Sequence, residues 1–273
     1  VVKDELQHHS RGCYTALSRV KRENRQAEHA LARAERLSAL ANLACGAPNR
    51  HAELEDAWQG VLFNQFHDIL AGTSIREAYE DVWQLYAHAM SVAARVENVA
   101  LAALEEELDI PDRADARAFV VWNPLAWERT EAVQLSIDLA HWRADRVGMR
   151  YPGQPSIVDA AGNDVPCQLT EVVFDHSTYV AHIVALVSVP ALGATTLYVT
   201  IPVQEPLAED KPTQYATELD NGNLSIEIDP DTGWLVSLWD IEHNQELLGG
   251  PAALPLVIDD PSDTWSHDVA SFR

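Results

Sequence analysis

The spacing of apolar residues changes once along the chain, from a helical period to an alternating one. In residues 13–44 the apolar positions, including Ala16 and Leu17, recur at three- and four-residue steps, which predicts one long amphipathic helix. The same spacing predicts a second helix from about Glu53 to the region of residue 67, and a third from Ser74 to about residue 108. Because short loops join neighbours that run in opposite directions, these helices should form an antiparallel three-helix bundle.

The side chains of the predicted bundle separate into a core and a charged face. The aromatic residues Trp58, Trp83 and Tyr86 fall at helical spacing and are expected in the core rather than on a sugar-binding surface. The charged positions of the first helix, which lie mostly between its apolar ones, are Lys21, Arg22, Glu23, Arg25, Glu28 and Arg33. They predict a solvated face, and a docking face for a further domain is the alternative interpretation.

From Ala118 onward the pattern is typical of β-strands. Residues 109–117 have the proline and the alternating charges of a linker. Short alternating or β-branched stretches then follow at residues 119–122, 132–137, 165–169, 179–189 and 195–201. An Asn221-Gly222 hairpin signal opens a further β unit.

The expected architecture is therefore multidomain, with a helical part and two β parts. It consists of a helical bundle over residues 1–110, a small antiparallel β-sandwich over 118–202, and the beginning of a larger, incomplete β-sandwich over 215–273. The fold class is α and β, with the antiparallel bundle followed by antiparallel β-sandwich units.

A polar His-Asp pair interrupts the apolar run between the second and third helices, in the stretch FNQFHDILAGTS. Gly72 stands where a helix end needs a residue tolerant of positive φ, and Ser74 with Glu77 forms a capping-box pattern for the third helix. His67 and Asp68 should therefore project from the last turn of a helix or from the corner after it. Such a pair is either a satisfied structural contact or part of a metal or catalytic site.

Composition narrows the classes of protein and of partner. The chain has 273 residues, 47% of them apolar, and a net charge of -23, which disfavours nucleic acid and anionic membranes as partners. Its apolar runs are too short to cross a bilayer, and its N-terminus lacks a secretory signal. The missing initiator Met suggests a piece of a longer chain. The widely spaced Cys13, Cys45 and Cys167 indicate neither a disulfide framework nor a thiolate zinc site, which favours the cytoplasm.

The stretch FNQFHDILAGTS resembles the FNQFHDILPGSS segment of the α-mannosidases of glycoside hydrolase family 38. Three other stretches resemble the same family in the same order, so that nearly the whole chain is covered: residues 5–15 with 21–25, residues 121–129, and residues 263–267. The chain departs from the family pattern at Ala71, where Pro is common, and at Thr73, where Ser is common. Phe66 stands where some branches have a second His, so the subfamily is left open.

The resemblance implies a zinc-dependent retaining α-mannosidase, cytoplasmic and bacterial, that hydrolyses terminal α-mannosyl residues of a mannose-containing glycan. In that family the nucleophile, the acid/base carboxylate and three zinc ligands lie on an N-terminal catalytic barrel, which this chain lacks. The resemblance makes His67 the last zinc ligand and Asp68 a contact of the bound mannose. The fragment is then expected to be inactive alone and to share its zinc with the barrel of the same polypeptide; self-association is left open.

The alternative is a non-enzymatic module that binds carbohydrate or mediates assembly. Exposed aromatic residues on one sheet face would favour it, and the candidates are Trp122, Trp127 and Trp142. His8 and His9 either line the edge facing the missing barrel or occupy surface and capping positions. His267 has no assigned role.

Overall fold

The computed structural model describes residues 11–113, 115–139, 151–175, 178–204 and 216–255. The chain falls into two compact units that divide after Pro206. The first unit contains the helices and strands β1 to β8, and the second contains β9 to β12.

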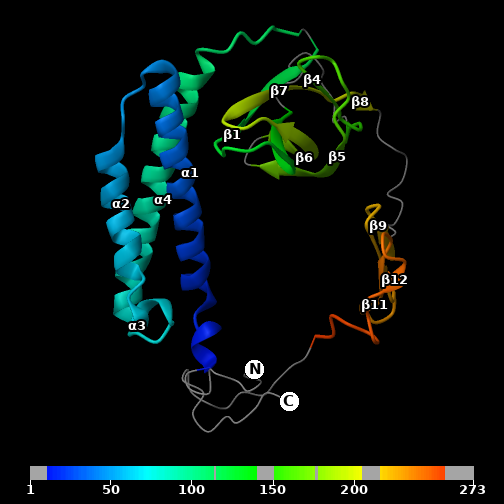
Figure 1. Ribbon diagram of the computed structural model, residues 1–273, viewed down its shortest axis with the longest axis horizontal. Helices are drawn as coiled ribbons and strands as arrows, with labels where there is room; N and C mark the ends of the chain where they lie inside the picture. Colours follow the sequence, from blue (N-terminus) through cyan, green and yellow to red (C-terminus); the bar gives the residue numbers. More distant parts are fainter. Residues whose placement is uncertain (1–10, 114, 140–150, 176–177, 205–215, 256–273) are drawn as a thin grey trace. The chain divides into compact units, whose positions relative to one another are not determined.

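The first part of the chain is an antiparallel helical bundle, as its periodicity predicts. The helical elements are η1 (Arg11–Tyr14), α1 (Ser18–Cys45), α2 (His51–Asn64), α3 (His67–Leu70) and α4 (Arg76–Glu105). In Figure 1 the long helices α1, α2 and α4 lie side by side, and the single turn of α3 closes the end where α2 meets α4. None of the helices in the described residues is long and apolar enough to cross a membrane.

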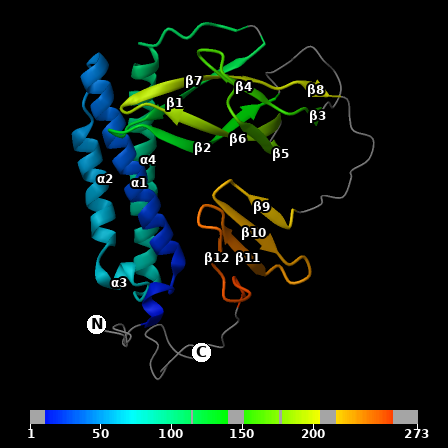
Figure 2. The same cartoon turned by 45° about the vertical axis from the view of Figure 1, so that its right-hand side comes forward.

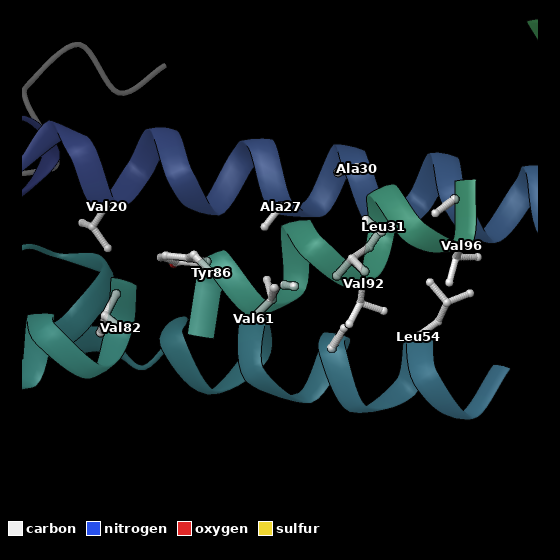
Figure 3. Close-up of a cluster of buried hydrophobic side chains, with 14 of the residues drawn as sticks. Val20, Ala27, Ala30, Leu31, Leu54, Val61, Val82, Tyr86, Val92 and Val96 are labelled. Carbon is white, nitrogen blue, oxygen red and sulfur yellow. The ribbon is translucent and has the colours of Figure 1, made fainter. Parts of the chain in front are cut away.

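One apolar interior joins the three long helices. Its fully buried side chains include Val20 and Leu31 of α1, Val61 of α2, and Tyr86 and Val96 of α4. Figure 3 shows these side chains converging from all three helices. Tyr86 is 1% exposed, and Trp58 and Trp83 pack half-buried against the same interior, which confirms the expected core role of these aromatics.

The starts of α1 and α4 differ from the sequence prediction. Helix α1 begins at Ser18 rather than near residue 13, because Leu17 has a φ of 46° and 40% exposure and so cannot continue the apolar stripe. The predicted capping box of Ser74 and Glu77 is wrong. Helix α4 begins after Ile75 without a side-chain cap, and the Ser74 amide donates instead to the Tyr79 hydroxyl.

The β part of the first unit is an antiparallel sandwich, as the alternating pattern predicts. Its strands are β1 (Arg117–Asn123), β2 (Arg129–Asp138), β3 (Tyr151–Pro152), β4 (Ser156–Asp159), β5 (Cys167–Asp175), β6 (Thr178–Val189), β7 (Gly193–Thr200) and β8 (Val203–Gln204). They pair as β1-β7-β4, as β2-β6-β5 and as the short ribbon β3-β8 (Figure 2). The first two sheets share one interior, to which Ile137, Ile183 and Leu197 contribute fully buried side chains.

The second unit is a four-stranded antiparallel sheet. Its strands are β9 (Glu218–Asp220), β10 (Leu224–Ile228), β11 (Leu235–Asp240) and β12 (Gln245–Glu246), in the order β12-β11-β10-β9. The predicted hairpin at Asn221-Gly222 joins β9 to β10, with Gly222 at a φ of 83°. The Asn221 side chain accepts hydrogen bonds from the amides of Asn223 and Leu224, which explains the choice of Asn at this turn.

Candidate functional site

The His-Asp pair lies on the single-turn helix α3, directly after α2. Only Gln65 and Phe66 separate the last residue of α2 from His67. Phe66 takes an extended conformation, with φ −51° and ψ 137°, which breaks the helix and redirects the chain. His67 and Asp68 thus form the first turn after a sharp corner at the end of the bundle.

Both side chains of the pair face solvent. The His67 imidazole is 79% exposed and the Asp68 carboxylate 46%, and His67 Nε2 lies 3.5 Å from Asp68 Oδ1. The Phe66 ring packs against the imidazole, with 4.3 Å between ring centroids. An imidazole nitrogen and a carboxylate side by side can bind a metal ion, accept hydrogen bonds from sugar hydroxyls, or bind each other.

The described residues do not complete a metal site around this pair. Among them, no three His, Cys, Asp or Glu side chains come close enough to hold an ion. A zinc site needs three or four protein ligands. The donor set at this corner therefore fits a contribution of one or two ligands to a site completed by residues elsewhere.

Large apolar side chains surround the corner on its outer side. Leu62, Phe63, Phe66 and Ile75 are all more than half exposed. Within residues 63–66 the exposed side chains, Phe63 and Phe66, are apolar, whereas the buried side chain of Asn64 is polar. This inversion of the usual arrangement is typical of a surface that a further protein segment covers.

The inward polar residues Asn64 and Gln65 anchor the end of α2 to both neighbouring helices. Asn64 is fully buried, and its amide donates to the Val82 carbonyl of α4 at 3.2 Å. The Gln65 amide donates to the Glu28 carboxylate of α1 at 2.8 Å and to Asn24 Oδ1 at 3.3 Å. The sequence prediction did not include these anchors, although Asn64 continues the apolar stripe of Ala57 and Val61 at helical steps.

Lys21, which was predicted to lie on a solvated face, also anchors the corner. It is half-buried, and its Nζ donates to the Ala71 carbonyl at 3.0 Å and to the Ala16 carbonyl. Burial lowers the pKa of the Lys21 ammonium. The prediction of solvation fails here because one lysine reaches from α1 to the carbonyl end of α3.

Gly72 and Tyr79 make further contacts that hold the corner in place. Gly72 has the predicted positive φ, 83°, and a Cβ at this position would lie 2.5 Å from the Ala16 carbonyl oxygen. The Tyr79 hydroxyl donates to the Ile69 carbonyl at 3.0 Å and accepts from the Ser74 amide. Burial raises the pKa of Tyr79 above its ordinary value, which favours the neutral phenol further.

The acidic side chains with the clearest pKa shifts serve turns rather than catalysis. Hydrogen bonds lower the pKa of four carboxyl groups, chiefly from the Asn163 side chain to Asp159, the Thr232 amide to Asp229, the His243 amide to Asp240 and the Ser237 hydroxyl to Glu246. A general acid at neutral pH needs a raised pKa instead. These four carboxylates are therefore turn and strand-end caps.

The remaining candidates are spread over the chain. Trp127 is 61% exposed, whereas Trp122 is half-buried against a cluster of Leu37, Ala41, Ala100 and Leu104. Trp142, His8, His9 and His267 lie outside the described residues.

Comparisons with known proteins show that this chain is similar to α-mannosidases. The family described as the α-mannosidase middle domain matches residues 8–104, which span the bundle and its His67–Asp68 corner. α-Mannosidase 2C1 of Mus musculus is 29% identical over 245 residues, covering 87% of this chain and 19% of the mouse protein. α-Mannosidase G of Dictyostelium discoideum is 39% identical over 79 residues, covering 28% of this chain and 7% of that protein.

Solved structures share the fold. A protein of glycosyl hydrolase family 38 from Enterococcus faecalis superposes with a TM-score of 0.61 at 22% identity, covering 85% of this chain and 30% of its own. An α-mannosidase from Enterococcus faecalis V583 gives a TM-score of 0.62 at 20% identity, covering 85% and 29%. Residues 8–104 thus match the middle domain of α-mannosidases, and 85% of the chain shares the fold of these family 38 structures. The chain spans about a fifth of the length of the two curated α-mannosidase 2C1 relatives, whose matches cover 87% of it.

Proposed function

We propose that the chain is part of a zinc-dependent, retaining α-mannosidase that hydrolyses terminal α-mannosyl residues. His67 supplies one zinc ligand and Asp68 contacts the sugar. The observation that carries the proposal is the exposed pair at a rigid corner, surrounded by apolar side chains of the kind that a neighbouring domain covers. The proposed neighbour is the N-terminal catalytic barrel of the same polypeptide.

The donor chemistry supports a shared zinc site. A neutral imidazole nitrogen and carboxylate oxygens are ordinary ligands of Zn²⁺, and the corner offers one of each. When bound, zinc would supply Lewis-acid stabilisation and orientation of the sugar hydroxyls. His67 must then be in its neutral form, and Asp68 must be ionised to accept a hydrogen bond from a hydroxyl group.

Retention of configuration requires two carboxyl groups about 5–5.5 Å apart, one as nucleophile and one as acid/base. We assign both to the barrel, as the resemblance to the family 38 α-mannosidases implies. The isolated chain should therefore not hydrolyse an aryl α-mannoside. It should also bind zinc weakly, because the part of the chain that the structure describes brings no three His, Cys, Asp or Glu side chains together.

The experiment compares the full-length polypeptide with its His67→Ala variant in zinc content and in turnover of an aryl α-mannoside. Loss of zinc and of nearly all turnover, with unfolding unchanged, is the expected result. His88→Ala is a matched control, because His88 is an exposed histidine on α4 that also faces a carboxylate, with Nε2 3.2 Å from Asp56 Oδ2. Unchanged zinc and turnover in the His67 variant would refute the assignment.

The exposed indole of Trp127 favours a non-enzymatic carbohydrate-binding or assembly module. Calorimetric titration of the chain with mannose-containing glycans, before and after Trp127→Ala, tests this second candidate. Saturable binding that Trp127→Ala abolishes, with the His67 variant unimpaired in turnover, would favour the module.

The proposed setting is the cytoplasm of a bacterium. The chain has three widely spaced cysteines and no Cys-x-x-Cys motif, which suits a reducing compartment. Fractionation of the source cells, followed by detection of the polypeptide, checks this assignment.

A further inference from the structure

The end of α2 determines where His67 is held. Two residues join α2 to α3, and the helical turn of α3 has no side-chain cap at its start. The position of His67 therefore depends in part on where the chain leaves α2. Asn64 ties the end of α2 to α4, and Gln65, the first residue after α2, ties the exit to α1.

Gln65 is bound from α1 by two polar partners. Its Nε2 donates to Glu28 Oε1 at 2.8 Å and to Asn24 Oδ1 at 3.3 Å. Asn24 is 5% exposed and in turn donates to the same Glu28 oxygen at 3.1 Å. An amide that donates to a carboxylate makes a stronger bond than one that donates to a neutral group, so Glu28 is the main partner.

The partners of Gln65 are themselves fixed. The Tyr86 hydroxyl of α4 donates to Asn24 Oδ1 at 3.3 Å from a ring that is 1% exposed. On the solvent side, Arg25 Nη1 lies 2.6 Å from Glu28 Oε2. The cluster of Gln65, Asn24, Glu28 and Tyr86 thus ties the exit of α2 to both other long helices.

We propose that Gln65 is a positioning residue for the active site: through Glu28 and Asn24 it fixes the corner and so the presentation of His67 and Asp68. The inference rests on the function proposed above and adds a residue that does not itself touch metal or sugar. Displacing a reacting or binding group by about 1 Å can cost about 100-fold in rate, so a side-chain anchor two residues away is expected to matter.

The test uses the full-length polypeptide and three variants. Gln65→Met keeps the length of the side chain and removes the amide. Gln65→Glu places a carboxylate against Glu28. The double variant Glu28→Gln, Gln65→Glu restores the pair with donor and acceptor exchanged. Gln59→Met is the control, because Gln59 is exposed on α2, six residues before Gln65.

The measurements are kcat and KM on an aryl α-mannoside, zinc per chain after dialysis, and thermal unfolding. Gln65→Met and Gln65→Glu should lose about 10- to 100-fold in kcat/KM or in zinc affinity, as supporting residues around metal ligands do. The double variant should regain most of that loss relative to Gln65→Glu, and Gln59→Met should behave as wild type.

Several results would overturn the inference. Gln65→Met could lower the unfolding temperature while leaving kcat/KM and zinc as in Gln59→Met, which would make Gln65 structural only. If Gln65→Met does not fold, the double variant decides: no gain over Gln65→Glu, or failure to fold as well, contradicts a positioning pair.

His67→Ala separates the two proposals. If that variant loses zinc and turnover while Gln65→Met does not, only the positioning role fails. If it keeps both, the function proposed above fails as well.

Discussion

Gly72→Ala tests the corner most directly, because it adds a single methyl group at the point where α3 meets the segment before α1. Gly72 has a φ of 83°, and the new Cβ would lie 2.5 Å from the Ala16 carbonyl oxygen and 2.9 Å from its carbonyl carbon. Both neighbours are backbone atoms, which cannot move aside as a flexible side chain can. The variant should therefore both strain the backbone and push the two segments apart.

The magnitude has two parts. A left-handed conformation costs a non-glycine residue about 1–2 kcal/mol. Forcing a methyl group into a filled site adds about 1–3 kcal/mol. The free energy of unfolding should thus fall by about 2–5 kcal/mol in all.

Two other glycines of the bundle separate these parts. Gly46 ends α1 at a φ of 71°, and an alanine Cβ there would have nothing within 4 Å, so Gly46→Ala should cost only the backbone part. Gly60 lies inside α2, where an added Cβ would meet Leu85 at an ordinary 3.5 Å. Gly60→Ala should stabilise by about 0.5–1 kcal/mol, because alanine loses less chain entropy in a helix.

The assay is urea unfolding followed by far-ultraviolet circular dichroism, with the midpoint and the slope fitted separately. The expected order of midpoints is Gly60→Ala above wild type, then Gly46→Ala, then Gly72→Ala. If Gly72→Ala costs no more than Gly46→Ala, the close approach to Ala16 does not exist in the folded protein and the reasoning is refuted.

Three other outcomes are expected. Burial raises the pKa of Tyr86 to about 12, so its contribution to stability is complete below pH 10 and is lost as the pH rises toward 12. The loss in the free energy of unfolding should be at most about 2–3 kcal/mol. It should vanish in Tyr86→Phe when unfolding is measured against pH. Asn123→Asp puts a carboxylate where the Asn123 Nδ2 donates to the carbonyls of Trp127, Val189 and Pro190. The free energy of unfolding should fall by about 2–4 kcal/mol, and an unchanged melting temperature would contradict this. Leu31→Ala should lower the free energy of unfolding, measured in urea, by about 2–5 kcal/mol. Leu43→Ala, at an 84% exposed site on the same helix, should change it little. Equal effects would place Leu31 outside the core.

The sequence predicts the helices and strands well because burial follows their periods. The alternation at residues 132–137 lies within β2, and that at 195–201 lies within β7 up to its end at Thr200; the helical stripe gives the core around Tyr86. The period says nothing, however, about a residue in a left-handed conformation. Leu17 continues the apolar spacing of the sequence, yet the chain turns there. Next to it, Ala16 lies close to Gly72, and this contact joins residues far apart in sequence, so the local period cannot predict it.

The candidate site, too, can be predicted from the sequence only in part. The exposed pair at residues 67 and 68 and the positive φ of Gly72 follow from local signals. The supporting contacts do not, since Lys21 and Gln65 act across helices and a charged or amide side chain is normally taken as solvated. Polar residues on an apolar stripe, as Asn24 and Asn64 are, are the local signs of that inner network.

Lys21 gives this corner a built-in chemical reporter. The chain has three lysines, Lys3, Lys21 and Lys211, and Lys21 is the one that lies in the described residues. Its amine bridges the carbonyls of Ala16 and Ala71 at a partly buried site, so separation of those segments should change how fast an acylating reagent modifies it. Once they do, the amine returns to water and reacts as an ordinary lysine. The rate of acylation at Lys21, followed by peptide mass, would therefore record opening of the corner in the unaltered protein.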